Sequence, residues 1–445
     1  MENAIDIFYK IEQEYNLFDL KEEDCAAPWD LFRHQVLIRI ATPINKNQRI
    51  KLTPKKLIQF APILFKSLFE LNKKKCSTLL FSTNRYSDKD GLWYDKASDD
   101  IGRFFKKHQG GLLDLDDLKP GNKYKNKVLY NPLPIFKFTH KDYSNLSENT
   151  YQKIRDAYTN NVPGLSIPYE CLNSQYRSFQ QERAYYTKLF KKVSPERIIF
   201  VQNGVQKGMI AAARICGIPI YEMQHAVYGK QHVLYHYPEI DNIADQFYPD
   251  VIFTFGPKWS KDFKMPTRIV PLGNSCFFIG PGNVVRDSNT IVFISSIVHG
   301  AFLFPIARDL ASSHPEFKII FKLHPGEFFR YDEIIQKFSA NNNVEVVRNE
   351  IDTSSLFDVA GLVVAINSTA QYEALDKGAK VAILKASNYL WQDACFDHPN
   401  LHLFESIDEL DAIIASPLHK TEPLFFRKFN PDVLKEFLTS EPTLK

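Results

Sequence analysis

The sequence predicts an α/β protein built from two Rossmann-like domains that face a central cleft. Short apolar runs alternate with helical patterns of roughly 10–15 residues through the second half, which is typical of a parallel sheet covered by helices. Residues 197–223 have the pattern of a strand–helix–strand crossover. The length of 445 residues exceeds the usual size of one hydrophobic core. We therefore expect two domains.

The first half of the chain is irregular and rich in Tyr, Lys and Asn. An amphipathic helix is expected from Ala27 onward, because apolar residues recur at helical spacing through Ile40. Residues 78–82 form a predicted strand, whereas 108–150 are expected to hold loops and short strands. The crossover that follows comprises a strand at 197–201, an Asn203-Gly204 turn, a helix at 206–216 capped by Gly217, and a strand at 218–223.

The second half contains a series of short apolar runs that we interpret as strands of one doubly wound sheet. These predicted strands are 251–255, 268–271, 290–295, 317–323, 344–347, 361–366 and 380–384. The change of pattern between residues 238 and 250 places the boundary there. We expect a first domain at 1–240, a second domain at 241–422, and a last helix within 423–445 that packs back across the junction.

Composition excludes several classes of protein. Lys and Arg total 55 against 52 Asp and Glu, so a net charge of +3 indicates no nucleic-acid partner. The N-terminus lacks the features of a secretory signal, and no apolar run reaches the roughly 18 residues of a membrane span. The six cysteines form no CxxC pair, which indicates reduced thiols with structural roles rather than a zinc knuckle. We therefore expect a cytoplasmic protein.

Residues able to bind an anion directly follow three of the predicted strands in the second half. They are Ser295 and Ser296, the run His324, Pro325, Gly326 and Glu327, and the pair Ser368 and Thr369. The carboxyl ends of parallel strands meet at one edge of a sheet, where open α/β folds bind their ligands. An imidazole, neighbouring hydroxyls and free N–H groups would cradle a phosphate. The sequence thus predicts a nucleotide site.

Some of these residues also have a structural interpretation. Ser368 and Thr369 would cap the following helix, a role that is compatible with phosphate binding. Glu373, in the first turns of that helix, would hold ribose hydroxyls or favour the helix N-terminus. Ser295 and Ser296 would also suit an ordinary turn. The other His-Pro pair, at His314, precedes its strand and is expected at the opposite edge of the sheet.

The first domain offers two kinds of candidate for a general base. His225 follows an apolar strand and precedes a loop rich in Tyr and His, and an imidazole titrates near cytosolic pH. Asp90, Asp95 and Asp99 follow the predicted strand 78–82 and are alternatives. The sequence does not choose among them.

No catalytic metal is predicted. Asp114-Leu115-Asp116 has the spacing of a DxD motif but lies in a polar stretch of the first half, away from the predicted nucleotide domain. Neither a GxGxxG nor a Walker sequence indicates a dinucleotide or ATP site. We expect no bound cofactor, and a nucleotide-linked donor as co-substrate.

Several motifs together resemble GT-B glycosyltransferases of bacterial surface polysaccharide synthesis. His324-Pro325 and Ser368-Thr369 look like the HP and S/T motifs of sialyl-, polysialyl- and Kdo transferases that use CMP-linked donors. The run 222–225 is similar to an ElQHG segment of capsule and O-antigen transferases, although Ala226 stands where that pattern has Gly. Further similarities are the helix at 29–33, the turn at 255–259, and Glu373-Ala374-Leu375 with Gly378. The likeness extends from about residue 25 to 390.

This resemblance implies a GT-B fold and an inverting, metal-independent glycosyltransferase. The favoured donor is CMP-linked Kdo or sialic acid, and the acceptor is a surface glycan or a lipid-linked glycan. Such an enzyme would work in the cytoplasm, with peripheral association at the inner face of the membrane. Sugar transfer needs a stabilised leaving phosphate, a base for the acceptor hydroxyl and a site that excludes water. His324 would bind or protonate the phosphate, and His225 would act on the acceptor side.

Three alternatives remain open. A UDP- or GDP-linked sugar would serve the same fold. A CDP-glycerol or CDP-ribitol phosphotransferase also combines His-containing segments with a GT-B scaffold, but a strongly basic membrane-binding helix that would favour it is not seen in the sequence. The third alternative is a non-catalytic nucleotide-sugar-binding protein of a polysaccharide assembly complex.

Overall fold

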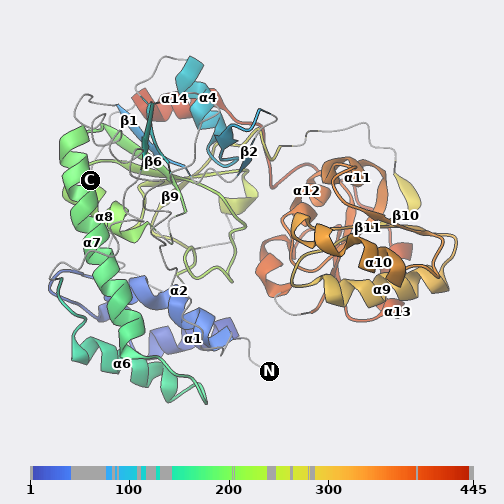
Figure 1. The fold of residues 1–445 in the computed structure, drawn as a ribbon, viewed down its shortest axis with the longest axis horizontal. Helices are drawn as coiled ribbons and strands as arrows, with labels where there is room; N and C mark the ends of the chain where they lie inside the picture. Colours follow the sequence, from blue (N-terminus) through green and yellow to red (C-terminus); the bar gives the residue numbers. More distant parts are fainter. Residues whose placement is uncertain are drawn as a thin grey trace.

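Two parallel sheets, each covered by helices, form the protein in its computed structural model (Figure 1). The structure describes residues 4–41, 77–82, 86–87, 90–107, 112–116, 127–130, 143–202, 204, 206–237, 247–260, 264–278, 280, 286–386 and 389–439. The predicted α/β class with two Rossmann-like sheets is confirmed. The Asn203 turn and most of the boundary at 238–250 lie outside the described residues.

The first sheet has seven parallel strands in the order β5-β4-β1-β6-β7-β8-β9. They are β1 (Thr78–Phe81), β4 (Leu112–Asp116), β5 (Lys127–Tyr130), β6 (Arg197–Val201), β7 (Ile220–Met223), β8 (Val251–Thr254) and β9 (Arg268–Pro271). A small antiparallel pair, β2 (Tyr86–Ser87) with β3 (Trp93–Tyr94), follows β1. The expected boundary near residue 240 assigned β8 and β9 to the second domain. Hydrogen bonding to β7 instead places both in the first sheet.

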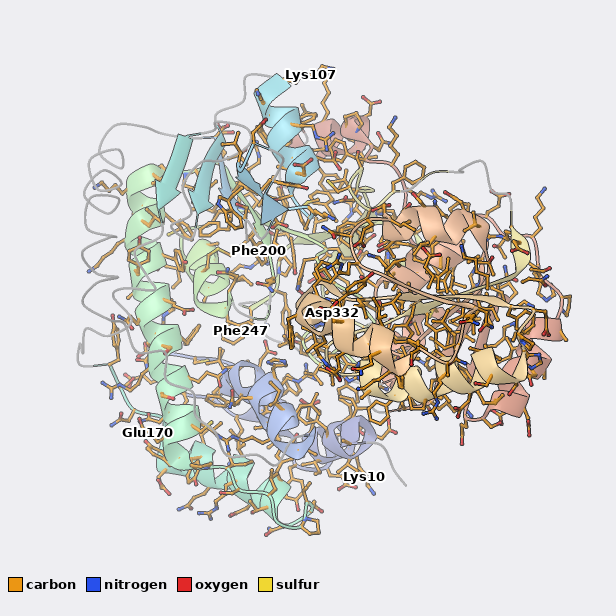
Figure 2. All side chains as sticks on the ribbon, turned by 45° about the vertical axis from the view of Figure 1, so that its right-hand side comes forward. Lys10, Lys107, Glu170, Phe200, Phe247 and Asp332 are labelled. Atoms are coloured by element: carbon orange, nitrogen blue, oxygen red, sulfur yellow. The ribbon has the colours of Figure 1, made fainter. Side chains whose placement is uncertain are left out.

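Helices cover the first sheet and form a separate layer below it (Figure 1). They are α1 (Ala4–Glu14), α2 (Pro28–Ala41), α4 (Asp99–Lys107), α6 (Glu148–Thr159), α7 (Tyr169–Val193) and α8 (Lys207–Ile215). Figure 2 shows Phe200 and Phe247 inside this domain, where both are fully buried, whereas Lys107 and Glu170 lie at its outer ends.

A buried ionic cluster ties α1 and α2 to the loop that follows β7. The Arg33 guanidinium donates to the Glu12 carboxylate, at 2.5 and 3.0 Å, and to the main-chain oxygens of Val233 and His236. Because Arg33 and Glu12 are both buried, each charge depends on the other for compensation. The helices at the N-terminus therefore hold the loop that carries His225 and its neighbours.

The second sheet has six parallel strands in the order β12-β11-β10-β13-β14-β15. They are β10 (Asp287–Ile294), β11 (Lys318–Lys322), β12 (Val344–Val347), β13 (Ala360–Ala365), β14 (Lys380–Leu384) and β15 (Leu401–Phe404). The helical elements are α9 (Gly300–Ser313), η5 (Pro325–Arg330), α10 (Tyr331–Lys337), α11 (Thr353–Val359), α12 (Ala370–Asp376), η6 (Tyr389–Cys395) and α13 (Ile407–Ala415). Buried Val, Ile and Phe side chains on both faces account for the apolar runs that predicted most of these strands.

The last helix, α14 (Pro431–Thr439), packs on the first sheet rather than the second. Its Leu434 is fully buried in the core that contains Leu80 and Ile199. The ring of Phe437 contacts those of Tyr221 and Phe253 at 6.4 and 5.4 Å. In Figure 1 this red helix lies beside α4, far from the other red and orange elements. The chain therefore crosses the domain junction a second time.

Candidate functional site

The three predicted donor-binding segments meet at one edge of the second sheet. β11 and β13 both pair with β10, so Ser295, His324 and Ser368 follow three adjacent strands. The strand order reverses between β10 and β13, because β11 and β12 lie on one side and β14 and β15 on the other. Ligands of open α/β sheets bind at such a switch point.

His324 caps the short helix η5 and presents its ring at the surface. Its Nδ1 accepts a hydrogen bond from the Gly326 N–H at 3.0 Å, and Pro325 takes the first helical position, where no N–H is needed. A ring that accepts at Nδ1 carries its proton on Nε2. The exposed imidazole therefore offers Nε2–H as a donor.

Glu327 and Ser295 bind each other instead of facing the solvent. Ser295 Oγ donates to Glu327 Oε1 at 3.1 Å, and the His324 N–H donates to Glu327 Oε2 at 3.1 Å. Both side chains are 3% exposed. A Cβ on Gly300 would lie 2.5 Å from each of these two oxygens, so the contact leaves no spare room. Direct donor contacts by these two side chains were expected; their buried geometry favours a positioning role.

Ser296 and Ser368 act as local caps at the same edge. Ser296 Oγ lies 3.1 Å from His299 Nδ1 and accepts from the His299 N–H at 3.2 Å, just before α9 begins. Ser368 Oγ accepts from the Ala370 N–H at 3.3 Å, which is the capping interpretation of that residue. Thr369 makes no such cap bond, and it is exposed. Its hydroxyl is thus available to a ligand at this edge.

Glu373 lies on α12 at the junction of the two domains. Burial raises the pKa of its carboxyl from 4.5 to about 7, against the opposing effect of Lys96, a cation of the first domain. A pocket beside it is lined by the segment after β9, by α12 and by residues that precede α14. The lining residues are Phe277, Phe278, Gly280, Glu373, Asp376, Lys377, Pro423 and Phe426. Sequence reasoning missed all of these except Glu373, because the pocket combines segments that are distant in the chain.

His225, the candidate in the first domain, is half-buried beside two stacked tyrosines. The Tyr228 and Tyr235 rings stack at 4.0 Å, and the His225 ring lies 6.5 and 6.3 Å from them. Both tyrosine hydroxyls donate to Oε1 of Glu222, a fully buried residue on β7. The aromatic loop is therefore anchored to its own sheet by a carboxylate.

The same loop touches the second domain. The Lys230 N–H donates to Asp393 Oδ2 at 3.1 Å, and the ring of His232 lies 6.3 Å from that of Trp391. Asp393 and Trp391 both belong to η6. Burial lowers the pKa of His232 to about 3, so this ring is neutral near pH 7. The His225 loop thus lies at the domain junction.

The three candidate carboxylates that follow β1 have different environments. Asp95 is buried, and its Oδ1 accepts from the Ala97 N–H at 2.9 Å. Asp99 pairs with Arg103 at the start of α4 and is also buried. These contacts suit turn and helix formation. Asp90 is exposed, so of the aspartates considered it has the accessibility that a base requires.

Within the described ranges, no group of three or more His, Cys, Asp and Glu side chains could hold a metal ion. Asp114 and Asp116 lie within strand β4. The described part of the chain also contains no helix long and apolar enough to cross a membrane.

Comparisons with known proteins yield structural likenesses of low sequence identity. UDP-GlcNAc 2-epimerase from Methanocaldococcus jannaschii is 11% identical with a TM-score of 0.46, over 81% of this chain and 99% of that one. MurG from Acinetobacter baumannii is 11% identical with a TM-score of 0.44, over 81% and 89%. The calicheamicin glycosyltransferase CalG4 is 11% identical with a TM-score of 0.46, over 77% and 91%.

No protein-family model matches the sequence, and no curated protein matches it.

Proposed function

We propose that the protein is an inverting, metal-independent glycosyltransferase of the GT-B type. The observation that carries this proposal is the meeting of the His324, Ser296 and Thr369 segments at the switch point of the second sheet. Groups that can donate hydrogen bonds to a phosphate then lie at one edge of the second sheet. Glu373 lies at the domain junction, where the His225 loop also contacts the second domain.

Each group has a task in the proposed reaction. The bond between the anomeric carbon and the phosphate oxygen breaks, and a bond from that carbon to the acceptor oxygen forms. His324 Nε2–H and the Thr369 hydroxyl stabilise the charge that develops on the leaving phosphate. Glu373 accepts hydrogen bonds from ribose hydroxyls. His225 receives the proton of the acceptor hydroxyl, and Asp90 is the alternative base.

The proposed donor is a CMP-linked acidic sugar, Kdo or sialic acid, and the support is the resemblance of the His324-Pro325 and Ser368-Thr369 motifs to transferases of that class. UDP- and GDP-linked sugars are alternatives that a binding panel separates. The proposed acceptor is a surface glycan or a lipid-linked glycan at the cytoplasmic face of the membrane. No observation favours the phosphotransferase or the non-catalytic alternative.

Calorimetry with CMP, CDP, UDP and GDP tests this proposal. His324→Ala is the variant, and His314→Ala is its matched control, because His314 belongs to the other His-Pro pair and precedes β11. We expect CMP to bind the wild type most tightly, and His324→Ala to lose about tenfold in affinity, near the 1.4 kcal/mol of one charge-assisted hydrogen bond. Preference for UDP or GDP would discard the CMP donor. Absence of binding by all four nucleotides would overturn the enzyme assignment.

A further inference from the structure

One segment between the two domains forms hydrogen bonds with both of them. We call residues 424–427 the strap, since they lead from the second domain to α14. The main-chain N–H groups of Leu424, Phe425 and Phe426 all donate to the carboxylate of Asp376, at 2.6 to 3.0 Å. Asp376 is the last residue of α12 in the second domain. One carboxylate thus holds three consecutive N–H groups.

The opposite side of the strap is bonded to the first domain. Lys258 N–H donates to Leu424 O at 3.2 Å, and Trp259 Nε1 donates to Phe425 O at 2.6 Å. Arg427, the last residue of the strap, donates its N–H to Phe255 O at 2.8 Å. A Cβ on Gly256 would lie 2.5 Å from Phe425 O, so the two backbones touch. The strap is therefore a rigid spacer between α12 and the turn after β8.

The helix α12 also carries residues of the proposed donor site. Thr369 precedes its first residue, and Glu373 lies one turn before Asp376. The Tyr372 ring between them contacts those of Trp259 and Phe425, at 5.1 and 4.9 Å. The first half of α12 would meet the donor, and its end meets the strap. Both parts belong to the same short helix and therefore move together. Any shift of α12 against the strap moves the donor against the first domain.

We propose that Asp376 is a positioning residue for sugar transfer, which fixes the donor helix α12 relative to the acceptor-side domain through the strap. This inference rests on the proposed function, and it assigns to Asp376 no contact with reacting atoms. Its effect is to keep the anomeric carbon of the donor within reach of the acceptor base. Small displacements of reacting groups reduce rates strongly.

A carboxylate suits this task better than any other side chain of its size. Its two oxygens accept all three N–H groups, with the Phe425 N–H shared between them. An asparagine has the same shape but only one oxygen, and its NH2 group would face a donor. Asp376→Asn therefore loses at least one of the bonds to the strap without leaving a cavity.

Steady-state kinetics combined with nucleotide calorimetry tests the role of Asp376. We expect Asp376→Asn to bind the nucleotide that the wild type prefers with unchanged stoichiometry and nearly unchanged Kd, while kcat falls by about tenfold or more. The control is Asp397→Asn. It removes another ion pair across the junction, with Lys258, but Asp397 is 70% exposed and is not on α12, so kcat should not change.

A second variant approaches the strap from the other domain. Trp259→Phe removes the Nε1 donor to Phe425 O while keeping a ring against Tyr372. We expect the same fall in kcat with unchanged stoichiometry. Wild-type kcat in both variants would overturn the positioning role, and so would a fall in binding stoichiometry that matches the fall in kcat, because that indicates unfolded protein. Failure of the wild type to bind any nucleotide would overturn the proposed function itself.

Discussion

Replacement of Glu373 by Gln should remove a pH dependence from nucleotide binding. Burial raises the pKa of the Glu373 carboxyl from 4.5 to about 7, so ionising it in the folded protein costs about 3 kcal/mol more than in the unfolded chain. A carboxylate that accepts two ribose hydroxyls must be ionised to do so. Affinity for a nucleotide should then fall about tenfold for each pH unit below 7.

Stability should change with pH in the opposite sense. Between pH 4.5 and 7 the folded state keeps the proton of Glu373 and the unfolded state has lost it. The free energy of unfolding therefore falls as the pH rises through this window, by up to about 3 kcal/mol, and the effect of this group is constant above it. Glu373→Gln has no such proton and should lack this contribution.

The assay is calorimetric titration of the preferred nucleotide from pH 5.5 to 8.5 on the wild type and on Glu373→Gln. The ratio of the two affinities cancels the titration of the phosphate and of other protein groups. The affinity of the wild type divided by that of Glu373→Gln should rise with pH up to about 7 and then level off. A ratio that does not vary with pH would refute this reasoning, because it would show that the raised pKa and the ribose contact do not both hold.

Three further substitutions probe the frame of the site. Glu327→Gln keeps one acceptor oxygen where two are used, so the free energy of unfolding should fall by about 1–3 kcal/mol in urea denaturation, and an unchanged midpoint would contradict this. Gly256→Ala would press a methyl group against Phe425 O and should lower stability by about 1–3 kcal/mol in the same assay. In the wild type, Lys207 Nζ lies 3.0 Å from the buried Asp30 carboxylate, and Lys207→Met would remove this cation. The free energy of unfolding should then fall by about 3–5 kcal/mol, and a further Asp30→Asn change should partly restore it.

The architecture of the second domain was largely predictable, because its strands are buried on both faces and leave continuous apolar runs. β14, for example, is buried along its whole length. β15, with two half-buried residues of four, carries a weaker signal and was not predicted. The placement of β8 and β9 failed for a different reason. An apolar run predicts a strand, but it does not say which neighbouring strand it will pair with.

The candidate site was predictable where it depends on strand ends and unpredictable where it depends on tertiary contacts. The segments at His324 and Ser368 follow from the position of the carboxyl edge. The position of Glu327 in the sequence suggests a residue that binds the donor. Only its contact with Ser295 shows that the carboxylate binds groups of the protein instead. Asp376 gave no signal, because its donors lie 48 to 50 residues further along the chain.

The contacts across the junction explain why the two halves of the proposed reaction can work together. The His225 loop is held from its own domain by Glu222 and from the second domain by Asp393. Helix α12 is held by the core of its own sheet and, through Asp376 and the strap, by the first domain. A mechanism without covalent chemistry by the protein depends on position and on electrostatic stabilisation. The carboxylates of Asp376 and Asp393 at this junction therefore matter to the proposed transfer as much as the imidazoles of His225 and His324, which would meet the substrates.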